Sequence, residues 1–302
     1  MKKTLISVVI LTALFTTGCQ DKDAQAKIEQ LNQTVTQLTA ENMQLKADLT
    51  AEKERASKII PAIFAEEDVV FKKSETIKFP KPKAGEDYWP EEGKIEYSIS
   101  TLKTNIDWLN NLLWEELTRD GNSVPTREQL IQYYQKGFDE THRAMLEEPS
   151  LAFETNSWVN FIGQKEKLAT FSIGTYDFTG GAHGMGETRY LTVDLTSHKI
   201  LKLNDLFDEK DLPKVKELLW DNYTQQGTVK KDEDTFTPKT DFNVSDNIYL
   251  DSEGVHFIYS AYAIAPYAAG EPDLTLNWWQ LKDLLKPEFK QRNYVKFDED
   301  VK

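Results

Sequence analysis

Apolar residues recur every 3.5 positions through residues 26–57, and this is the first strong pattern along the chain. Such spacing keeps one stripe of a helix against a partner helix, so it predicts a coiled coil, expected to be a homodimer or homotrimer. Asn42 lies in the stripe, where a polar residue fixes the register of the helices. The alternative is a single amphipathic helix that lies against the globular part. The stripe consists of Ile28, Val35, Asn42, Leu49 and Ala56 in one column, and of Leu31, Leu38 and Leu45 in the other.

Apolar spacing typical of helices returns between residues 106 and 145 and predicts two helices. Gly121 is a suitable end for the first helix, and Thr126, followed by Glu128 and Gln129, is a suitable start for the second. An aromatic stripe on these helices is expected to belong to the core rather than to a ligand surface. Its members are Trp108, Trp114, Tyr133, Tyr134 and Phe138.

Alternation of apolar and polar residues predicts short strands in much of the remaining chain. One more helix is expected from Asp211 or Leu212, with Pro213 in its first turn and Gly227 at its end. Strands and helices are interleaved without a regular strand–helix–strand repeat. The expected fold class is therefore α+β, with mixed or antiparallel sheets and packed helices, preceded by the coiled-coil helix. The expected strands are 68–71, 76–79, 94–99, 157–162, 167–173, 189–195, 200–203, 247–250 and 255–259, with hairpin turns at 163–166 and 251–254.

The first 23 residues have the layout of a lipoprotein export signal. Lys2 and Lys3 precede the apolar stretch 5–15, which is too short to span a bilayer as a mature helix. Thr16-Thr17-Gly18-Cys19 follows and resembles a bacterial lipoprotein cleavage box, with Thr16 where leucine is usual. Cleavage would leave Cys19 as a lipid-carrying N-terminus. Gln20 stands where aspartate would resemble an inner-membrane retention signal, which favours the outer membrane.

Cysteine count and charge narrow the functional classes. Cys19 is the single cysteine, so an intramolecular disulfide and a cysteine-based zinc site are excluded. The formal net charge is −14; removal of Lys2 and Lys3 leaves 34 basic against 50 acidic residues, or −16. This charge disfavours nucleic acid and favours basic partners, although it would equally serve to keep an exported protein soluble.

Phe178 to Gly186 read FTGGAHGMG, four glycines around one histidine between two expected strands. Neither a Walker phosphate loop nor a dinucleotide fingerprint fits, because both need a following helix. His183 with Asp177 or Glu187 would suit a metal or general-base role. The alternative is that Gly180, Gly181 and Gly184 permit positive φ while His183 bonds backbone groups.

Other enzyme signatures are weak. The sequence has no GxSxG nucleophile elbow, and no spacing singles out a glycosidase carboxylate pair among its 50 acidic residues. The sequence therefore predicts no enzyme, no catalytic residue, no cofactor and no metal site.

Three segments together carry a resemblance to a known family. Tyr176–Gly184, Leu203–Phe207 and Ala265–Gly270 occur in an order and spacing that resemble the extracytoplasmic module of RsiV-like anti-sigma factors, which bind lysozyme. The likeness covers roughly residues 60–285. It implies recognition of lysozyme or of a cell-wall component, without implying sigma-factor control, because a lipoprotein signal and a coiled coil replace the sigma-binding segment and membrane helix of RsiV. The binding residues it implies are Thr179, Gly180, Gly181, His183, Pro266 and Tyr267; the alternative for the last two is a cis or tight turn that packs Tyr267 inward.

We therefore expect a lipid-anchored protein of the cell envelope, on the outer membrane, that binds lysozyme, with inhibition as one outcome, or a cell-wall component. Two alternatives are a structural lipoprotein that docks on peptidoglycan and a wall hydrolase that uses His183. The expected division of the chain is a signal peptide at 1–18, lipid attachment and coiled-coil stalk at 19–58, two halves of the RsiV-like module at 59–165 and 166–290, and a tail at 291–302.

Overall fold

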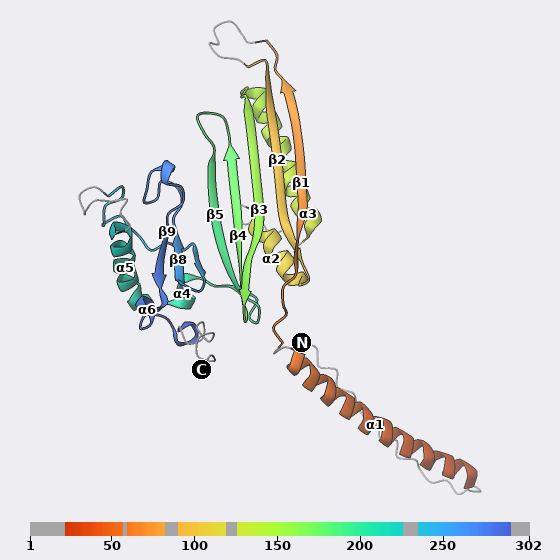
Figure 1. Cartoon of the computed structure of the whole chain (residues 1–302). Helices are drawn as coiled ribbons and strands as arrows, with labels where there is room; N and C mark the ends of the chain where they lie inside the picture. The colour runs from red at the N-terminus through yellow and green to blue at the C-terminus, as the bar shows by residue number, and fades with distance from the viewer. Residues whose placement is uncertain (1–21, 57–58, 82–89, 119–125, 226–234, 291–302) are drawn as a thin grey trace. The chain divides into compact units, whose positions relative to one another are not determined.

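The computed structural model describes residues 22–56, 59–81, 90–118, 126–225 and 235–290 (Figure 1). The expected signal peptide, Cys19 and the tail 291–302 lie outside these residues, as do the helix ends expected at Gly121 and Gly227. The chain divides into two compact units, Met1–Ile59 and Ile60–Lys302, and each is described by itself.

Helix α1, Lys22–Ala56, makes up the described part of the first unit. The sequence predicted a helix over residues 26–57, and this is confirmed, with a start four residues earlier. Its 35 residues give a rod of about 50 Å at 1.5 Å per residue. The apolar residues of the heptad stripe between Ile28 and Leu49 are exposed, from 55% at Leu49 to 67% at Leu45.

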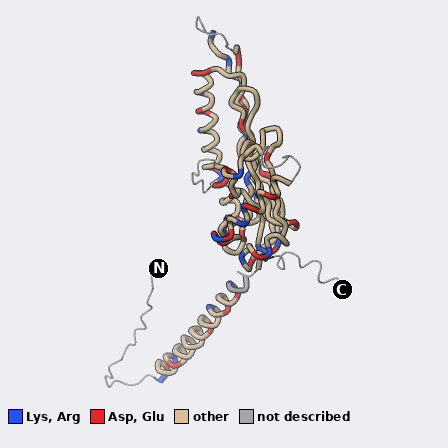
Figure 2. The backbone as a smooth tube through the Cα atoms, turned by 90° about the vertical axis from the view of Figure 1, so that its left-hand side faces the viewer, with Lys and Arg blue, Asp and Glu red and all other residues tan. Residues whose placement is uncertain are grey.

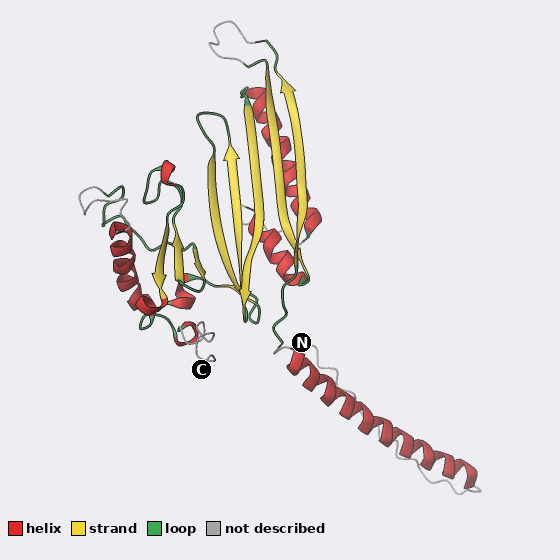
Figure 3. Cartoon of the chain, in the orientation of Figure 1, coloured by secondary structure: helices red, strands yellow, loops and turns green. Residues whose placement is uncertain are grey.

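The second unit confirms the expected α+β class (Figure 3). Its first part contains β1 (Ala65–Lys78), β2 (Glu92–Thr104), α2 (Asp107–Leu117), α3 (Arg127–Glu147), β3 (Ala152–Lys165), β4 (Leu168–Phe178), β5 (Met185–Asp194) and β6 (Lys199–Ile200). Its second part contains α4 (Leu203–Leu206), α5 (Leu212–Gln225), β7 (Ile248–Leu250), β8 (Gly254–Ile258), β9 (Asp273–Asn277) and α6 (Trp278–Leu281).

Strands β1 to β6 form a six-stranded sheet in sequence order. Neighbouring strands are antiparallel except for β2 and β3, which are parallel because the chain returns through α2 and α3 between them. Both helices lie on the same face of this sheet (Figures 1 and 2). Thr126 caps α3 as expected: its hydroxyl accepts a hydrogen bond from the amide of Gln129.

Apolar side chains between the sheet and these helices form the first of two cores. The aromatic stripe predicted for the core lies there: Tyr134 and Phe138 are buried, and Trp108, Trp114 and Tyr133 pack against them in partly buried positions. A second core joins α4, α5, α6 and the antiparallel sheet β7-β8-β9. Its aromatic members are Phe207, Trp220, Tyr223, Phe242, Phe257, Tyr259, Trp278 and Phe289.

Several strand boundaries differ from the expectation. The expected strands 68–71 and 76–79 form one strand, β1, which ends at Lys78, because β2 pairs with its whole length across a register shift near Val69. Gly163 lies inside β3, so the turn to β4 is tighter than the expected 163–166. The segment 200–203 pairs only at Ile200, and Leu203 already begins α4.

The expected boundary between residues 165 and 166 falls at the turn that joins β3 to β4. These strands pair along their length within one sheet. Among the described residues, the members of the two cores divide near residue 200, with Leu168 an earlier residue that packs in the second core.

Side chains from the second part cap the free edge of β5. The amide of Asn247 behaves like a strand residue: its Oδ1 accepts from Tyr190 N at 2.8 Å, and its Nδ2 donates to Thr188 O at 2.7 Å. Glu271 Oε1 accepts from Thr188 N at 2.7 Å. An edge strand would otherwise leave these backbone groups without partners. The bonds therefore satisfy the edge of β5 and connect the second part to the sheet.

Candidate functional site

The TGGAHG segment, residues 179–184, is the turn between β4 and β5. Gly180 and Gly181 have φ of +90° and +97°, which confirms the expected need for glycine at both. The same expectation for Gly184 is wrong. There glycine is required by close packing, since a Cβ would lie 2.4 Å from the ring of Tyr176.

The third segment of the resemblance, Ala265–Gly270, lies in the loop between β8 and β9, residues 259–272. Pro266 precedes a single 3-10 turn, Tyr267–Ala269, which ends at Gly270 with φ of +71°. The described residues contain no cis peptide bond, so of the two turns considered for Pro266 the tight trans turn is the one present.

These two loops, 83 residues apart in the sequence, meet in space. The imidazole of His183 stacks on the ring of Tyr267, with centroids 4.2 Å apart and planes at 23°. The Tyr267 hydroxyl donates to Gly184 O at 2.9 Å, and His183 Nδ1 lies 2.9 Å from the same oxygen. Both aromatic groups therefore fix the turn at Gly184, as expected for a histidine that bonds backbone.

Tyr262 extends this contact to a third ring. It stacks on Tyr267, with centroids 5.6 Å apart and planes at 30°. Tyr267 is half-buried, whereas His183 is exposed and Tyr262 is 48% exposed. Tyr267 thus positions its neighbours, and His183 and Tyr262 present the accessible aromatic surface. We call the surface formed by Thr179 to Gly184, Tyr262, Pro266 and Tyr267 the loop surface.

Sequence reasoning missed Tyr262. Its backbone has φ of +69°, a conformation that non-glycine residues seldom adopt and that no sequence pattern announces.

A cavity of about 580 Å³ adjoins the loop surface on the helix-covered face of the sheet. Its charged lining consists of Glu115, Glu116, Asp177, Glu187 and Arg189. Four carboxylates against one guanidinium give a formal charge of −3, and Arg189 is already paired with Glu116. Ser260, from the loop before Tyr262, donates to Glu187 at 3.1 Å and so ties the cavity to the loop surface. The cavity suits a cationic group.

The carboxylates considered as partners of His183 have other contacts. Asp177 accepts from Thr155 at 2.9 Å, and Glu187 accepts from Ser260. Within the described ranges, no group of three or more histidine, cysteine, aspartate or glutamate residues is arranged to hold a metal ion.

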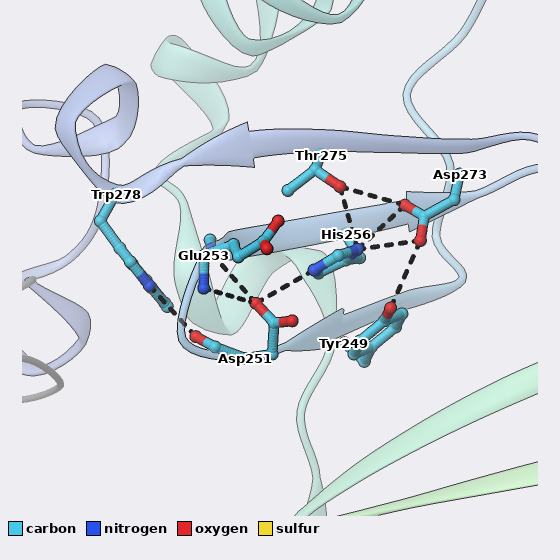
Figure 4. A network of polar contacts seen from close by, with 8 residues as sticks. Tyr249, Asp251, Glu253, His256, Asp273, Thr275 and Trp278 are labelled. Atoms are coloured by element: carbon cyan, nitrogen blue, oxygen red, sulfur yellow. Dashed lines mark hydrogen bonds and ion pairs between the residues drawn. The ribbon is translucent and has the colours of Figure 1, made fainter.

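His256 is the centre of a polar network at the base of the β8–β9 loop (Figure 4). Its side chain is 8% exposed and lies between two carboxylates: Nδ1 is 2.9 Å from Asp273 Oδ2, and Nε2 is 3.0 Å from Asp251 Oδ1. The Nε2 contact is an ion pair by distance, without hydrogen-bond geometry. Thr275 Oγ1 lies 3.0 Å from Nδ1, on the same nitrogen as Asp273, so the three do not form a nucleophile–base relay.

The two carboxylates determine the charge of this histidine. Burial is the largest single effect and opposes the charged ring, but the bonds and charges of Asp273 and Asp251 together outweigh it and raise the pKa of His256. The Tyr249 ring stacks on His256 at 4.2 Å and on Tyr190 of β5 at 4.3 Å. Burial, aided by Asp273, raises the pKa of Tyr249, which donates to Asp273 at 3.3 Å.

Sequence reasoning placed His256 in a strand and assigned it no role. The one signal in the sequence that could have drawn attention to His256 was its position opposite Tyr249 in the expected hairpin. Asp273 belongs to β9, which the sequence did not predict, and this explains the omission.

Cys19 lies outside the described residues. Within the part of the chain that the structure covers, no helix has the length and apolar character needed to cross a membrane.

Comparisons with known proteins agree with this architecture. The family described as a protein of unknown function, DUF3298, matches residues 204–278, from α4 to the start of α6. A crystal structure of a DUF3298 family member from Bacteroides fragilis has a TM-score of 0.58 at 20% identity, and one of a DUF3298 family protein from Pseudomonas aeruginosa has a TM-score of 0.53 at 22% identity. Each likeness covers 76% of this chain and 96% of the other, and at these identities it establishes a shared fold. No curated protein matches the chain.

Proposed function

We propose that this chain is a lipid-anchored binding protein of the bacterial cell envelope whose loop surface recognises a cationic protein of the lysozyme type. The observation that carries the proposal is the contact between residues 179–184 and 266–270: two of the three segments that resemble the RsiV-like module form one surface through His183, Tyr267 and Gly184. We take the meeting of these two segments on one surface to indicate that they bind the same partner, rather than that each is a turn with a separate role.

Charge supports a cationic partner. The cavity beside the loop surface carries a formal charge of −3 at its lining, and the mature chain would carry −16. Such a field raises the association rate of a basic protein and makes it fall with added salt. The exposed rings of His183 and Tyr262 are held rigid by the stack on Tyr267, so little side-chain entropy is lost on binding.

Calorimetry with c-type lysozyme, at low and at moderate salt, tests the proposal on residues 20–302. We expect binding that weakens with salt. Tyr262→Ala should weaken it about 10- to 100-fold, as for an interface hot spot. Trp279→Ala is the matched control: this indole is 66% exposed and belongs to α6, which follows the end of β9 remote from the loop. Absence of binding at low salt would remove lysozyme as the partner.

Docking on peptidoglycan is the alternative, and sedimentation with purified sacculi separates it from lysozyme binding. A sacculus-bound chain that ignores lysozyme would favour the structural role. For the hydrolase alternative, muropeptide turnover by wild type and His183→Ala is the comparison; equal turnover would exclude His183 from catalysis.

The proposed protein is a dimer or trimer through α1. Support comes from the exposed stripe of that helix, in which six apolar residues of two heptad columns are each more than half exposed in the single chain. A second copy buries such a stripe by knobs-into-holes packing. Lipid at Cys19 and oligomerisation through α1 would together hold several loop surfaces at one membrane.

A further inference from the structure

A second cavity, of about 760 Å³, adjoins the cavity beside the loop surface. The two share two lining residues, Glu116 of α2 and Arg189 of β5. The apolar lining of the second cavity consists of Leu191, Ile200, Leu201, Leu203 and Leu212. We call it the leucine cavity, and we call its neighbour beside the loop surface the acidic cavity. Its volume lies in the range of about 300–1,000 Å³ that is usual for binding sites.

The leucine cavity lies where the two cores divide. Leu191 belongs to the first core and Ile200 packs against it, whereas Leu201, Leu203 and Leu212 pack against the second core. Ile200 and these last three leucines are only partly buried, because each core covers its own side of the boundary. Apolar side chains that gather in an open depression are typical of a site that another molecule covers.

An ion pair crosses the boundary between the two cavities. The guanidinium of Arg189 donates to both the side chain and the backbone oxygen of Glu116, so it links β5 to the end of α2. The cavities on its two sides follow β5, with α2 on one flank and the second part on the other. We call the two together the seam groove. The second part contributes Leu203, Leu212, Asp246 and Asn247 to the leucine cavity, and Ser260 and Ala261 to the acidic cavity.

The two ends of the seam groove suit different groups of one ligand. In the acidic cavity, Glu187 accepts a hydrogen bond from Ser260 at 3.1 Å, and a carboxylate has about four acceptor sites, so it can also receive a cationic donor. In the leucine cavity, the apolar side chains suit an aliphatic or aromatic group. Lys202, Asn204 and Asp246 also line this cavity and offer donors and acceptors to peptide groups.

We propose that the seam groove binds an extended segment of the cationic partner, with a basic side chain in the acidic cavity and an apolar side chain in the leucine cavity. This inference rests on the proposed function and names the part of the partner that the groove takes. The acidic cavity reaches Ser260 and Ala261, directly before Tyr262, so one partner can contact the groove and the loop surface together. A fatty acyl chain fits less well, because it would remove water from Lys202 and Asp246 without offering them hydrogen bonds.

Asn204→Trp tests the leucine cavity without removing an apolar contact. Asn204 is an exposed lining residue, so an indole in its place would occupy space that the ligand needs. In calorimetry of residues 20–302 with c-type lysozyme at low salt, we expect this variant to bind about tenfold more weakly than wild type. Leu203→Ala, which removes part of the apolar lining, should weaken binding about threefold. Gln132→Trp is the matched control, since Gln132 is an exposed residue of α3 outside both cavities.

A peptide probe tests the seam groove without lysozyme. The probe is a capped pentapeptide of one arginine, two glycines and two leucines, in that order, titrated by calorimetry at low salt. We expect it to bind wild type at concentrations up to about 1 mM. Asn204→Trp in the protein, or serine in place of both leucines in the peptide, should weaken this binding about tenfold. Tyr262→Ala should bind the peptide as wild type does, because Tyr262 lines neither cavity.

The two titrations separate failure of the groove from failure of the proposed function, once thermal unfolding confirms that each variant is folded. Weaker binding of either ligand to Asn204→Trp, with Gln132→Trp unaffected, supports the seam groove. Equal binding by wild type, Asn204→Trp and Leu203→Ala would overturn it, as would binding of neither ligand to wild type. A chain that binds the peptide and ignores lysozyme would overturn the proposed function alone.

Discussion

The buried histidine between two carboxylates should make the stability of this protein depend on pH. His256→Gln removes the charge and the stacked ring while keeping a polar side chain of similar size. The pKa of His256 is raised in the folded chain, so the folded state binds more protons than the unfolded state above the ordinary histidine pKa of about 6.5. The stabilisation is therefore complete below about pH 6.5 and is lost as pH rises through the folded pKa.

The contacts of His256 set the size of the effect. Its hydrogen bond to Asp273 and its ion pair with Asp251 are together worth about 1.5–3 kcal/mol as charge-assisted contacts, and the lower half applies because both aspartates are 38% exposed. Stacking on Tyr249 adds about 0.5–1.5 kcal/mol. We expect His256→Gln to be about 2–3 kcal/mol less stable near pH 6, with the difference shrinking by about 1.4 kcal/mol per pH unit between the unfolded and folded pKa values.

Urea unfolding of wild type and variant at a series of pH values from about 5.5 to 8.5 measures this difference. The ionisable groups that contact the ring, Tyr249, Asp251 and Asp273, are present in both proteins and cancel to first order in the comparison. His142→Gln is the matched control, because His142 pairs with one carboxylate, Glu75, at 3.3 Å in a more exposed position and should cost under about 1 kcal/mol. A difference that stays constant, or grows, with rising pH would refute the assignment of a charged His256.

Three further predictions follow from particular contacts. Thr126→Ala removes the cap on Gln129 N and should lower the free energy of unfolding by about 1 kcal/mol in urea titration, whereas an unchanged value would show that the cap is replaced by solvent. Burial opposes ionisation of Asp194, but hydrogen bonds from Lys167, Thr196 and the backbone outweigh it and lower the pKa of Asp194 to about 2, so stability should fall as pH drops through that value. Lys167→Met should raise the pKa of Asp194 measured by carboxyl NMR, and an unmoved pKa would contradict the role of Lys167. Analytical ultracentrifugation should find an oligomer for residues 20–302 and a monomer after deletion of 20–57, and a monomer in both cases would rule out the coiled coil.

Local signals in the sequence predicted α1, α2, α3 and α5, because apolar spacing or a start signal marks each of them, whereas the four-residue helices α4 and α6 were missed. Thr126 starts α3, Pro213 lies in the first turn of α5, and the heptad stripe spans most of α1. Strand lengths were harder to predict, because the extent of a strand depends on its pairing with residues that are distant in the sequence. β1 continues through 72–75, where alternation is poor, since β2 offers a partner for every one of these residues. Strand β9 was missed for the same reason: its pairing with β8 follows a loop of 14 residues, 259–272.

The candidate site was also only partly predictable, because some of its features depend on residues that are distant in the sequence. Glycine at 180 and 181 was predictable from the need for positive φ in a turn, because that constraint is local. Gly184 serves a different purpose, set by the ring of Tyr176 across the hairpin, and no local rule distinguishes the two uses. The sequence left two roles open for His183, a metal or general-base role and hydrogen bonding to backbone groups, and its contacts in the structure are a backbone oxygen and the ring of Tyr267.

The β8–β9 loop connects the loop surface to the polar network around His256. Asp273 pairs with His256 across the strands that bracket residues 259–272, and Tyr249 carries this network to Tyr190 of β5. The opposite end of the same loop reaches Gly184 through Tyr267. The loop is therefore fixed to the sheet at its base by a charged histidine and near its tip by an aromatic stack. Loss of the charge at His256 should loosen the base first, so hydrogen exchange of 259–272 should accelerate in His256→Gln while that of α3 stays unchanged.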